Sequence, residues 1–203
     1  MQDGKAVQLL LNGEEHGHGH VVEKLLKRAE RLECLVAFAK ISAIGDLLKP
    51  LRKALEGGLK ARFAIGLDFY LTEPEALRQL FALAEKHALV LYLSNASDTF
   101  HPKIYAFQNG KQCSVIVGSA NLTHGGFYGN YEASALIDDA SGALMASVTR
   151  HLDALVADRI LVPATKPRID AYEREYIIHD TCRKVAKKRA QKASRTKGSD
   201  FTI

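Results

Sequence analysis

Several features that would narrow the class of protein are missing from this chain. Its 203 residues include only three cysteines, Cys34, Cys113 and Cys182, and no C-x-x-C pair. An odd, scattered set of cysteines argues against a disulfide framework and a cysteine-based zinc site, and it is typical of a reducing compartment. No run of about 18 apolar residues occurs, so we expect no transmembrane helix and no membrane partner.

The N-terminus lacks the basic segment followed by an apolar segment that marks a secretory signal peptide. Together with the cysteine pattern, this predicts a cytoplasmic protein. We find no internal repeat, and the polar motif described below occurs once. No cluster of carboxylates lies near that motif, so we expect neither a metal nor another cofactor.

The net charge of +5 is concentrated at the C-terminus. Residues 171–203 hold nine Lys or Arg against four acids, whereas the rest of the chain holds 19 of each. A basic tail on a neutral body suggests binding to a polyanion, although a solvated terminal helix would look the same. The candidate substrate-binding residues in this tail are Lys184, Lys187, Lys188 and Arg189.

Apolar periodicity predicts strands that alternate with helices, followed by a run of adjacent strands. We expect strands at 7–11, 35–41, 61–69, 89–93, 103–107, 113–117 and 132–137. We expect helices at 21–32, 44–55 with a bend at Pro50, 73–84 with Thr72 as the N-cap of a capping box, 144–156 and 172–193. This order predicts a mixed β-sheet flanked by helices, with an α/β domain over 1–164, a linker at 165–168 and a basic helical or disordered tail over 165–203.

Four polar side chains recur at spacings of two in the predicted strands. His101 and Lys103 are two residues apart, as are Ser119 and Asn121. Residues two apart on a strand project from the same face, so one sheet surface should gather all four side chains. A neutral imidazole is a competent nucleophile near pH 7, and an ammonium, a hydroxyl and an amide can bind phosphate oxygens.

Two further residues complete the predicted site. Gly118 leaves room for a phosphate close to the backbone. Glu132 is suited to accept the Nδ1–H of His101, which would turn Nε2 toward the substrate.

The pattern H-x-K at 101–103 followed by G-S-x-N at 118–121 resembles the HKD motif of the phospholipase D superfamily. The common form of that motif has an Asp five residues after the Lys, where this chain has Gln108. The combination with Asn121 and Glu132 is instead similar to the nuclease branch that contains a metal-independent restriction endonuclease. The resemblance implies a phospholipase D-like α/β fold and a phosphohistidine intermediate. It does not explain the tail.

The resemblance also implies a homodimer, because one motif copy supplies one histidine and the reaction needs a second as general acid. We therefore expect a metal-independent phosphodiesterase acting on nucleic acid, most simply a DNA endonuclease. Target recognition would be absent or would come from a recognition or helicase partner. Two alternatives stay open: a hydrolase of phospholipids or small phosphodiesters, and a non-catalytic DNA-binding module.

Two weaker patterns lie near the predicted site. His16, His18 and His20 alternate with glycines and could hold a metal, but a polar loop leading into a helix explains them more simply. The segment 125–130 has the composition of a flexible loop that borders the site and could contact a substrate.

Overall fold

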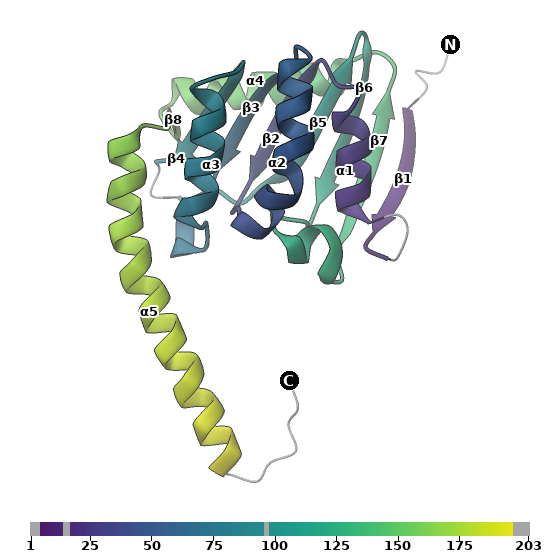
Figure 1. Cartoon of the computed structure of the whole chain (residues 1–203). Coiled ribbons are helices and arrows are strands. Elements are labelled where there is room, and N and C mark those ends of the chain that lie inside the picture. The colour runs from purple at the N-terminus through teal and green to yellow at the C-terminus, as the bar shows by residue number, and fades with distance from the viewer. Residues whose placement is uncertain (1–4, 14–16, 96–97, 197–203) are drawn as a thin grey trace.

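The computed structural model describes residues 5–13, 17–95 and 98–196, which form a mixed β-sheet flanked by helices (Figure 1). The strands are β1 (Lys5–Leu11), β2 (Arg31–Val36), β3 (Lys60–Ile65), β4 (Leu89–Ser94), β5 (Lys103–Asn109), β6 (Gln112–Gly118), β7 (Ala133–Asp139) and β8 (Leu161–Pro163). The helices are α1 (His18–Leu26), α2 (Ile41–Glu56), α3 (Pro74–Ala84), α4 (Ala143–Ala157) and α5 (Lys166–Thr196), with short turns η1 (Asp68–Tyr70) and η2 (Gly125–Gly129). The predicted α/β fold class is confirmed.

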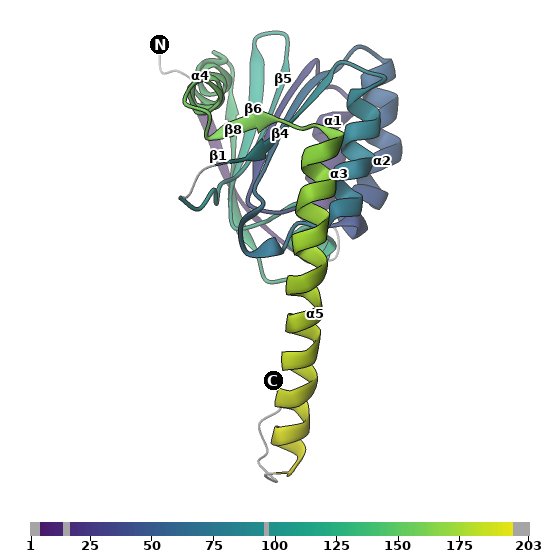
Figure 2. The same ribbon diagram turned by 90° about the vertical axis from the view of Figure 1, so that its left-hand side faces the viewer.

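The strand order in the sheet is β1-β7-β6-β5-β2-β3-β4-β8. The central strands β2, β3 and β4 are parallel, and all the other pairs are antiparallel. Parallel neighbours require crossover connections, which α2 and α3 provide. Helices α1, α2 and α3 cover one face of the sheet and α4 covers the other (Figure 2).

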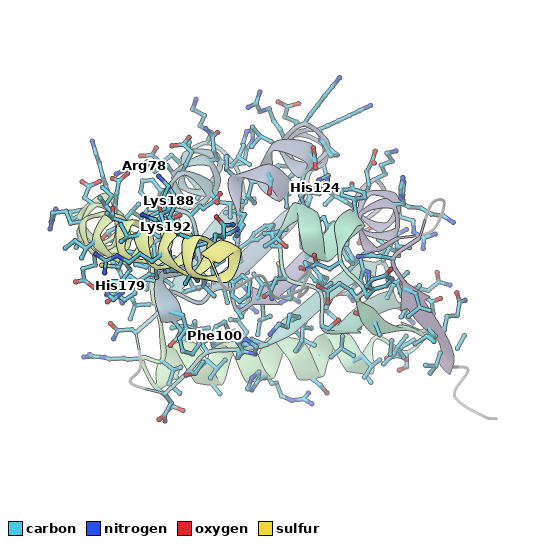
Figure 3. The ribbon with its side chains drawn as sticks, turned by 90° about the horizontal axis from the view of Figure 1, so that it is seen from below. Arg78, Phe100, His124, His179, Lys188 and Lys192 are labelled. Atoms are coloured by element: carbon cyan, nitrogen blue, oxygen red, sulfur yellow. The ribbon has the colours of Figure 1, made fainter. Side chains whose placement is uncertain are left out.

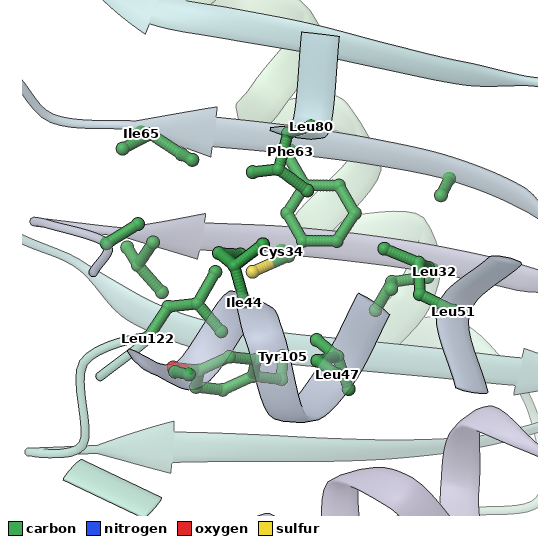
Figure 4. Close-up of a cluster of buried hydrophobic side chains, with 14 of the residues drawn as sticks. Leu32, Cys34, Ile44, Leu47, Leu51, Phe63, Ile65, Leu80, Tyr105 and Leu122 are labelled. Carbon is green, nitrogen blue, oxygen red and sulfur yellow. The ribbon is translucent and has the colours of Figure 1, made fainter. Parts of the chain in front are cut away.

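The largest part of the core lies between the sheet and α2 and α3 (Figure 4). Helix α2 buries a stripe with spacings of three and four residues, which is why this segment forms an amphipathic helix. Phe63 of β3 packs into the same cluster and is only 1% exposed. Burying one side chain of this size contributes about 1.5–3 kcal/mol to folding. The helix continues through Pro50, so the expected bend does not interrupt it.

Strand β2 begins four residues earlier than predicted. The prediction missed this start because the first part of the strand contains a buried charge. Glu33 is 0% exposed, and its carboxylate accepts hydrogen bonds from Arg62 at 2.8 Å and from Arg31 at 3.0 Å. A buried carboxylate is tolerated only when it is paired in this way. The pattern of apolar residues could not identify such a strand. The helix predicted before it was therefore too long: it ended at Leu32, whereas α1 ends at Leu26.

The predicted capping box at Thr72 is wrong. Helix α3 begins at Pro74, with Glu73 as its N-cap residue and no side-chain cap. The buried Thr72 hydroxyl instead donates to the Gly66 carbonyl at 2.6 Å and accepts from the Ala39 amide at 3.2 Å. Thr72 thus ties together the segments that follow β2 and β3, which a local sequence pattern cannot reveal.

Helix α5 starts at Lys166, inside the segment where a linker was expected. Ile169 and Tyr172 are buried against the body, and Arg78 of α3 forms ion pairs with Asp170 and Glu173. The second half of the helix extends beyond the body (Figures 1 and 2). None of the described helices is both long and apolar enough to cross a membrane.

Candidate active site

The predicted site residues meet at one edge of the sheet, where β5 starts and β6 ends. His101 precedes β5, Lys103 is its first residue, Ser119 and Asn121 follow β6, and Glu132 precedes β7. These three strands are antiparallel neighbours, so their ends converge. Of these five residues, only Lys103 lies within a strand. The expected gathering on a sheet face is therefore wrong in detail, and the other four side chains come from loop segments at the end of the sheet.

His101 and Lys103 are in direct contact. The Lys103 Nζ lies 2.7 Å from the His101 Nδ1 and 3.2 Å from the His101 carbonyl oxygen. His101 is exposed, and its ring centroid lies 6.3 Å from that of Phe38. Partial burial lowers the pKa of Lys103, and the nearby Glu132 carboxylate opposes that shift. An accessible imidazole beside an ammonium is suited to binding an anion.

Asn121 is buried and has a fixed amide orientation. Its Oδ1 accepts a hydrogen bond from the Phe38 backbone amide at 3.3 Å. The amide nitrogen is then the group that can donate to a ligand oxygen. The loop after β2, which carries Phe38, thus helps to set one predicted phosphate donor.

Glu132 binds neighbouring polar groups. It accepts hydrogen bonds from the Ser119 hydroxyl and, at 3.1 Å, from the Asn130 side-chain amide. Ser119 also accepts from the Ala133 amide at 3.0 Å. The expected hydrogen bond from the His101 Nδ1 to Glu132 is not among the contacts of the described residues. In this structure Glu132 orients Ser119, whereas both ring nitrogens of His101 lie near the Lys103 Nζ, Nδ1 at 2.7 Å and Nε2 at 3.1 Å.

Glycine at 118 is required by packing. A Cβ atom at this position would lie 2.3 Å from the Ser134 Oγ and 2.5 Å from the Ala133 carbonyl oxygen. Strand β7 therefore approaches β6 too closely for any side chain at 118. This reason differs from the predicted one, which was space for a phosphate.

A buried histidine, His18, supports these residues, and the sequence pattern does not reveal its role. His18 is 0% exposed. Its Nδ1 lies 2.6 Å from the Asn12 Oδ1, and its Nε2 lies 2.8 Å from the Ser134 Oγ. The Asn12 side-chain amide donates to the carbonyl oxygens of Gly126 and Asn130, each at 3.0 Å. The histidine thus supports the segment that carries Asn130, which in turn contacts Glu132.

The partners of His18 define its tautomer. Because Asn12 donates through Nδ2, its Oδ1 accepts, and the His18 Nδ1 must carry the proton. Burial lowers the pKa of His18, although Glu132 opposes that shift. His18 lies within α1 and not in a polar loop, and His16 falls outside the described residues. Within the described part of the chain, no three His, Cys, Asp or Glu side chains are grouped to hold a metal ion.

The segment 125–130, expected to be a flexible loop, contains the π-helical turn η2. A Cβ on Gly126 would lie 2.4 Å from the Asn121 carbonyl oxygen, so this turn packs closely on the segment after β6. The basic tail residues are not part of the same cluster. Lys184, Lys187, Lys188 and Arg189 are exposed on α5, and Lys184 is paired with Asp180 at 2.7 Å.

Residues 2–156 match the family described as "Cardiolipin synthase, PLD-like domain". The match covers more than half of the chain, so the chain belongs to the family of phospholipase D-like domains, as its motif predicted. Members of this family cleave or transfer phosphodiesters. No curated protein sequence matches the chain.

Solved structures show the same fold. Nuc from Salmonella typhimurium, a phospholipase D family member, is 17% identical with a TM-score of 0.61, over 80% of this chain and 100% of that one. NucT from Helicobacter pylori is 15% identical with a TM-score of 0.56, over 79% of this chain and 100% of that one. Phosphatidylserine synthase from Haemophilus influenzae is 16% identical with a TM-score of 0.65, over 96% of this chain but 48% of that one.

Proposed function

We propose that this protein is a metal-independent phosphodiesterase that cleaves nucleic acid, most simply a DNA endonuclease. The observation that carries this proposal is the contact between His101 and Lys103, 2.7 Å apart at an open edge of the sheet. Asn121 and Ser119 lie at the same edge. A phosphate bound there would meet a nucleophile, an ammonium and the Asn121 amide donor, which together can stabilise the transition state.

The proposed reaction has two steps. The unprotonated ring nitrogen of His101 attacks the phosphorus, a P–N bond forms, and the P–O bond to the leaving oxygen breaks as that oxygen takes a proton from an acid. Water then gives a proton to the conjugate base of that acid and attacks the phosphohistidine, a P–O bond forms, the P–N bond breaks, and both groups are regenerated. Lys103 and Asn121 bind the non-bridging oxygens in both steps. Glu132 acts by orienting Ser119.

The acid is proposed to be His101 of a second subunit. An exposed apolar surface lies beside the site, on the part of the sheet that α4 leaves uncovered. It contains Val7, Leu9, Leu11 and Val117, which are 66%, 74%, 51% and 40% exposed. Leu11 pairs with Ala133, so this apolar surface continues to the edge that holds Glu132. A second copy of the chain on this surface would bury it and would bring two catalytic edges together.

We further propose a division of labour between residues 1–164, which form the catalytic body, and the basic tail of residues 165–203. The free end of α5 extends past the edge of the sheet where η2 lies, and Figure 3 looks onto that end. Lys184, Lys187, Lys188 and Arg189 are exposed there. Such a row of cations suits the phosphates of a nucleic acid bound across the site.

The test is incubation of the purified chain with end-labelled DNA in EDTA. We expect cleavage, together with a covalent protein–DNA adduct after an acid-free denaturing quench. His101→Ala should lower the rate by about 10⁴-fold or more and abolish the adduct, because the nucleophile is lost. His151→Ala, a histidine exposed on α4, is the matched control and should cleave normally.

Three results would contradict the proposal. A strict requirement for Mg²⁺ in metal-free protein would exclude the mechanism. Hydrolysis of phosphatidylglycerol in vesicles, without cleavage of DNA, would show that the substrate is a phospholipid. Tight DNA binding with no turnover of any phosphodiester would make the chain a binding module.

A further inference from the structure

The short turn η1 has a backbone conformation that its residues do not favour. Phe69 and Tyr70 have φ angles of 59° and 52°, which place two aromatic residues in the left-handed region. Bulky residues rarely adopt these angles, because the Cβ approaches the following carbonyl. Such a turn persists only where its surroundings hold it, and it often lies near a functional site.

Helix α5 holds this turn through several side chains. The Arg183 guanidinium donates to the carbonyl oxygens of Phe69 and Tyr70, at 3.0 and 2.8 Å. The ring of His179 stacks on that of Tyr70, with centroids 3.9 Å apart and planes at 8°. The Tyr70 hydroxyl donates to Glu175 at 2.6 Å. Three turns of α5 thus bind one turn of the body.

Turn η1 also binds the residue next to the candidate nucleophile. The Asp68 Oδ2 accepts a hydrogen bond from the Phe100 backbone amide at 3.2 Å. Phe100 is buried and immediately precedes His101. Helix α5 therefore holds η1, and the Asp68 carboxylate of η1 holds the backbone next to His101.

Helix α5 also binds the start of the segment that leads to His101. The Arg168 guanidinium donates to the Ser94 carbonyl oxygen at 3.0 Å and to the Asn95 Oδ1 at 2.7 Å. The Ser94 hydroxyl accepts from the Leu67 amide, just before η1, at 2.9 Å. The segment between β4 and His101 is thus bound at its start by Arg168 of α5. It is bound at its end by Asp68 of η1, which α5 contacts.

We infer that residues 166–183 of α5 are a brace for the catalytic histidine, and that Asp68, Arg168 and Arg183 are positioning residues for His101. This inference rests on the proposed function only for the role of His101. It moves the boundary of the division of labour proposed above: residues 166–183 act with the catalytic body, and nucleic acid binding is left to the exposed cations beyond Arg183. Truncation after residue 165 would then impair hydrolysis of any substrate, large or small.

The first test uses the full chain and a small substrate, bis(p-nitrophenyl) phosphate. Asp68→Ala should lower kcat about tenfold with little change in KM, because it misplaces a group that acts in the transition state. Asp68→Asn should restore most of kcat, since its amide oxygen can accept the same Phe100 N–H. Arg174→Ala, on an exposed part of α5, is the control and should match the wild type. Wild-type kcat in Asp68→Ala, or equal loss in Asp68→Asn, would overturn the inference.

The second test separates positioning from folding. Arg183→Ala should lower kcat, and Phe69→Gly in the same chain should restore it, because glycine adopts the left-handed conformation without help. Asp68→Ala combined with Arg183→Ala should lose no more than the worse single variant, since both act through the same turn. An additive loss, or no rescue by glycine, would show that Arg183 serves stability alone.

A third measurement does not depend on activity. Hydrogen exchange at the Phe100 amide, followed by NMR, should be about tenfold faster in Arg183→Ala than in Arg174→Ala. Unchanged exchange would contradict the brace even if the wild-type chain proved inactive on every phosphodiester. Faster exchange in an inactive chain would leave the brace in place and overturn only the proposed function.

Discussion

His18 has both ring nitrogens bonded inside the protein, so its protonation depends on folding. Burial keeps its pKa below the ordinary value of 6.5. Below pH 6.5 the unfolded chain binds a proton at this position that the folded chain excludes. The unfolded state then binds more protons, and the free energy of unfolding must fall as the pH falls.

We therefore expect the wild-type chain to lose more stability between pH 7.5 and 5.5 than His18→Gln does. The difference for one group is at most about 1.4 kcal/mol per pH unit. Urea unfolding at both pH values measures it. Parallel pH dependence in the two proteins would show that His18 is not the titrating group.

The site residues differ in how far sequence alone could reveal them. His101, Lys103, Ser119 and Asn121 were predicted because a functional pattern of closely spaced residues identifies them. His18 and Asp68 were not, because their roles depend on partners distant in sequence, Ser134 and Phe100. The sequence offered one signal for each residue. His18 lies on the apolar face of a helix, and Asp68 is an acidic residue just after a parallel strand.

At the scale of elements, α5 has a packed half and a projecting half with different chemistry. The packed half carries Ile169 and Tyr172, whereas the projecting half is exposed and basic. The pattern of apolar residues predicted the strands β4 to β7 well, because each of them contains a run of consecutive apolar residues. It failed at β2, where the buried Glu33 interrupts the pattern, and it missed β8, which has three residues.

The projecting half of α5 should determine the salt dependence of nucleic acid binding. Replacing Lys187, Lys188 and Arg189 by Gln removes three charges from the full chain. If each contacts one phosphate, the slope of log Kd against log salt should fall by about three. Fluorescence anisotropy with a labelled duplex measures the slope.

The matched control removes three exposed charges from α2, at Lys49, Arg52 and Lys53. These lie in the second half of a helix that begins near the site and runs away from it (Figure 1). The control should keep the wild-type slope. Equal changes in the two triple variants would mean that only net charge matters, and the assignment of the tail would then fail.

At the scale of the whole molecule, the site as proposed is half of a reacting unit. Mixing wild-type chains with an excess of His101→Ala chains should reduce activity more steeply than the wild-type fraction, because a mixed dimer keeps one histidine of two. Activity of refolded mixtures on bis(p-nitrophenyl) phosphate measures this. A strictly proportional fall would contradict the shared site.

Leu9→Lys tests the surface on which the second copy is proposed to dock. Leu9 is 74% exposed in the single chain, so a lysine there should be tolerated in the monomer and costly when buried in a dimer. Analytical ultracentrifugation should find a monomer with the wild-type fold and little activity. A stable, active dimer would move the interface elsewhere.

The length of α5 sets the extent of nucleic acid that one chain can cover. The helix has 31 residues, and at about 1.5 Å per residue it is about 46 Å long. The part from Lys184 onward spans about 20 Å, close to the rise of six base pairs. Two such arms on a symmetric dimer would protect flanking segments on both sides of the cut. Nuclease footprints should then be wider than the catalytic edge itself, and should shrink from both ends when the arms are removed after Arg183.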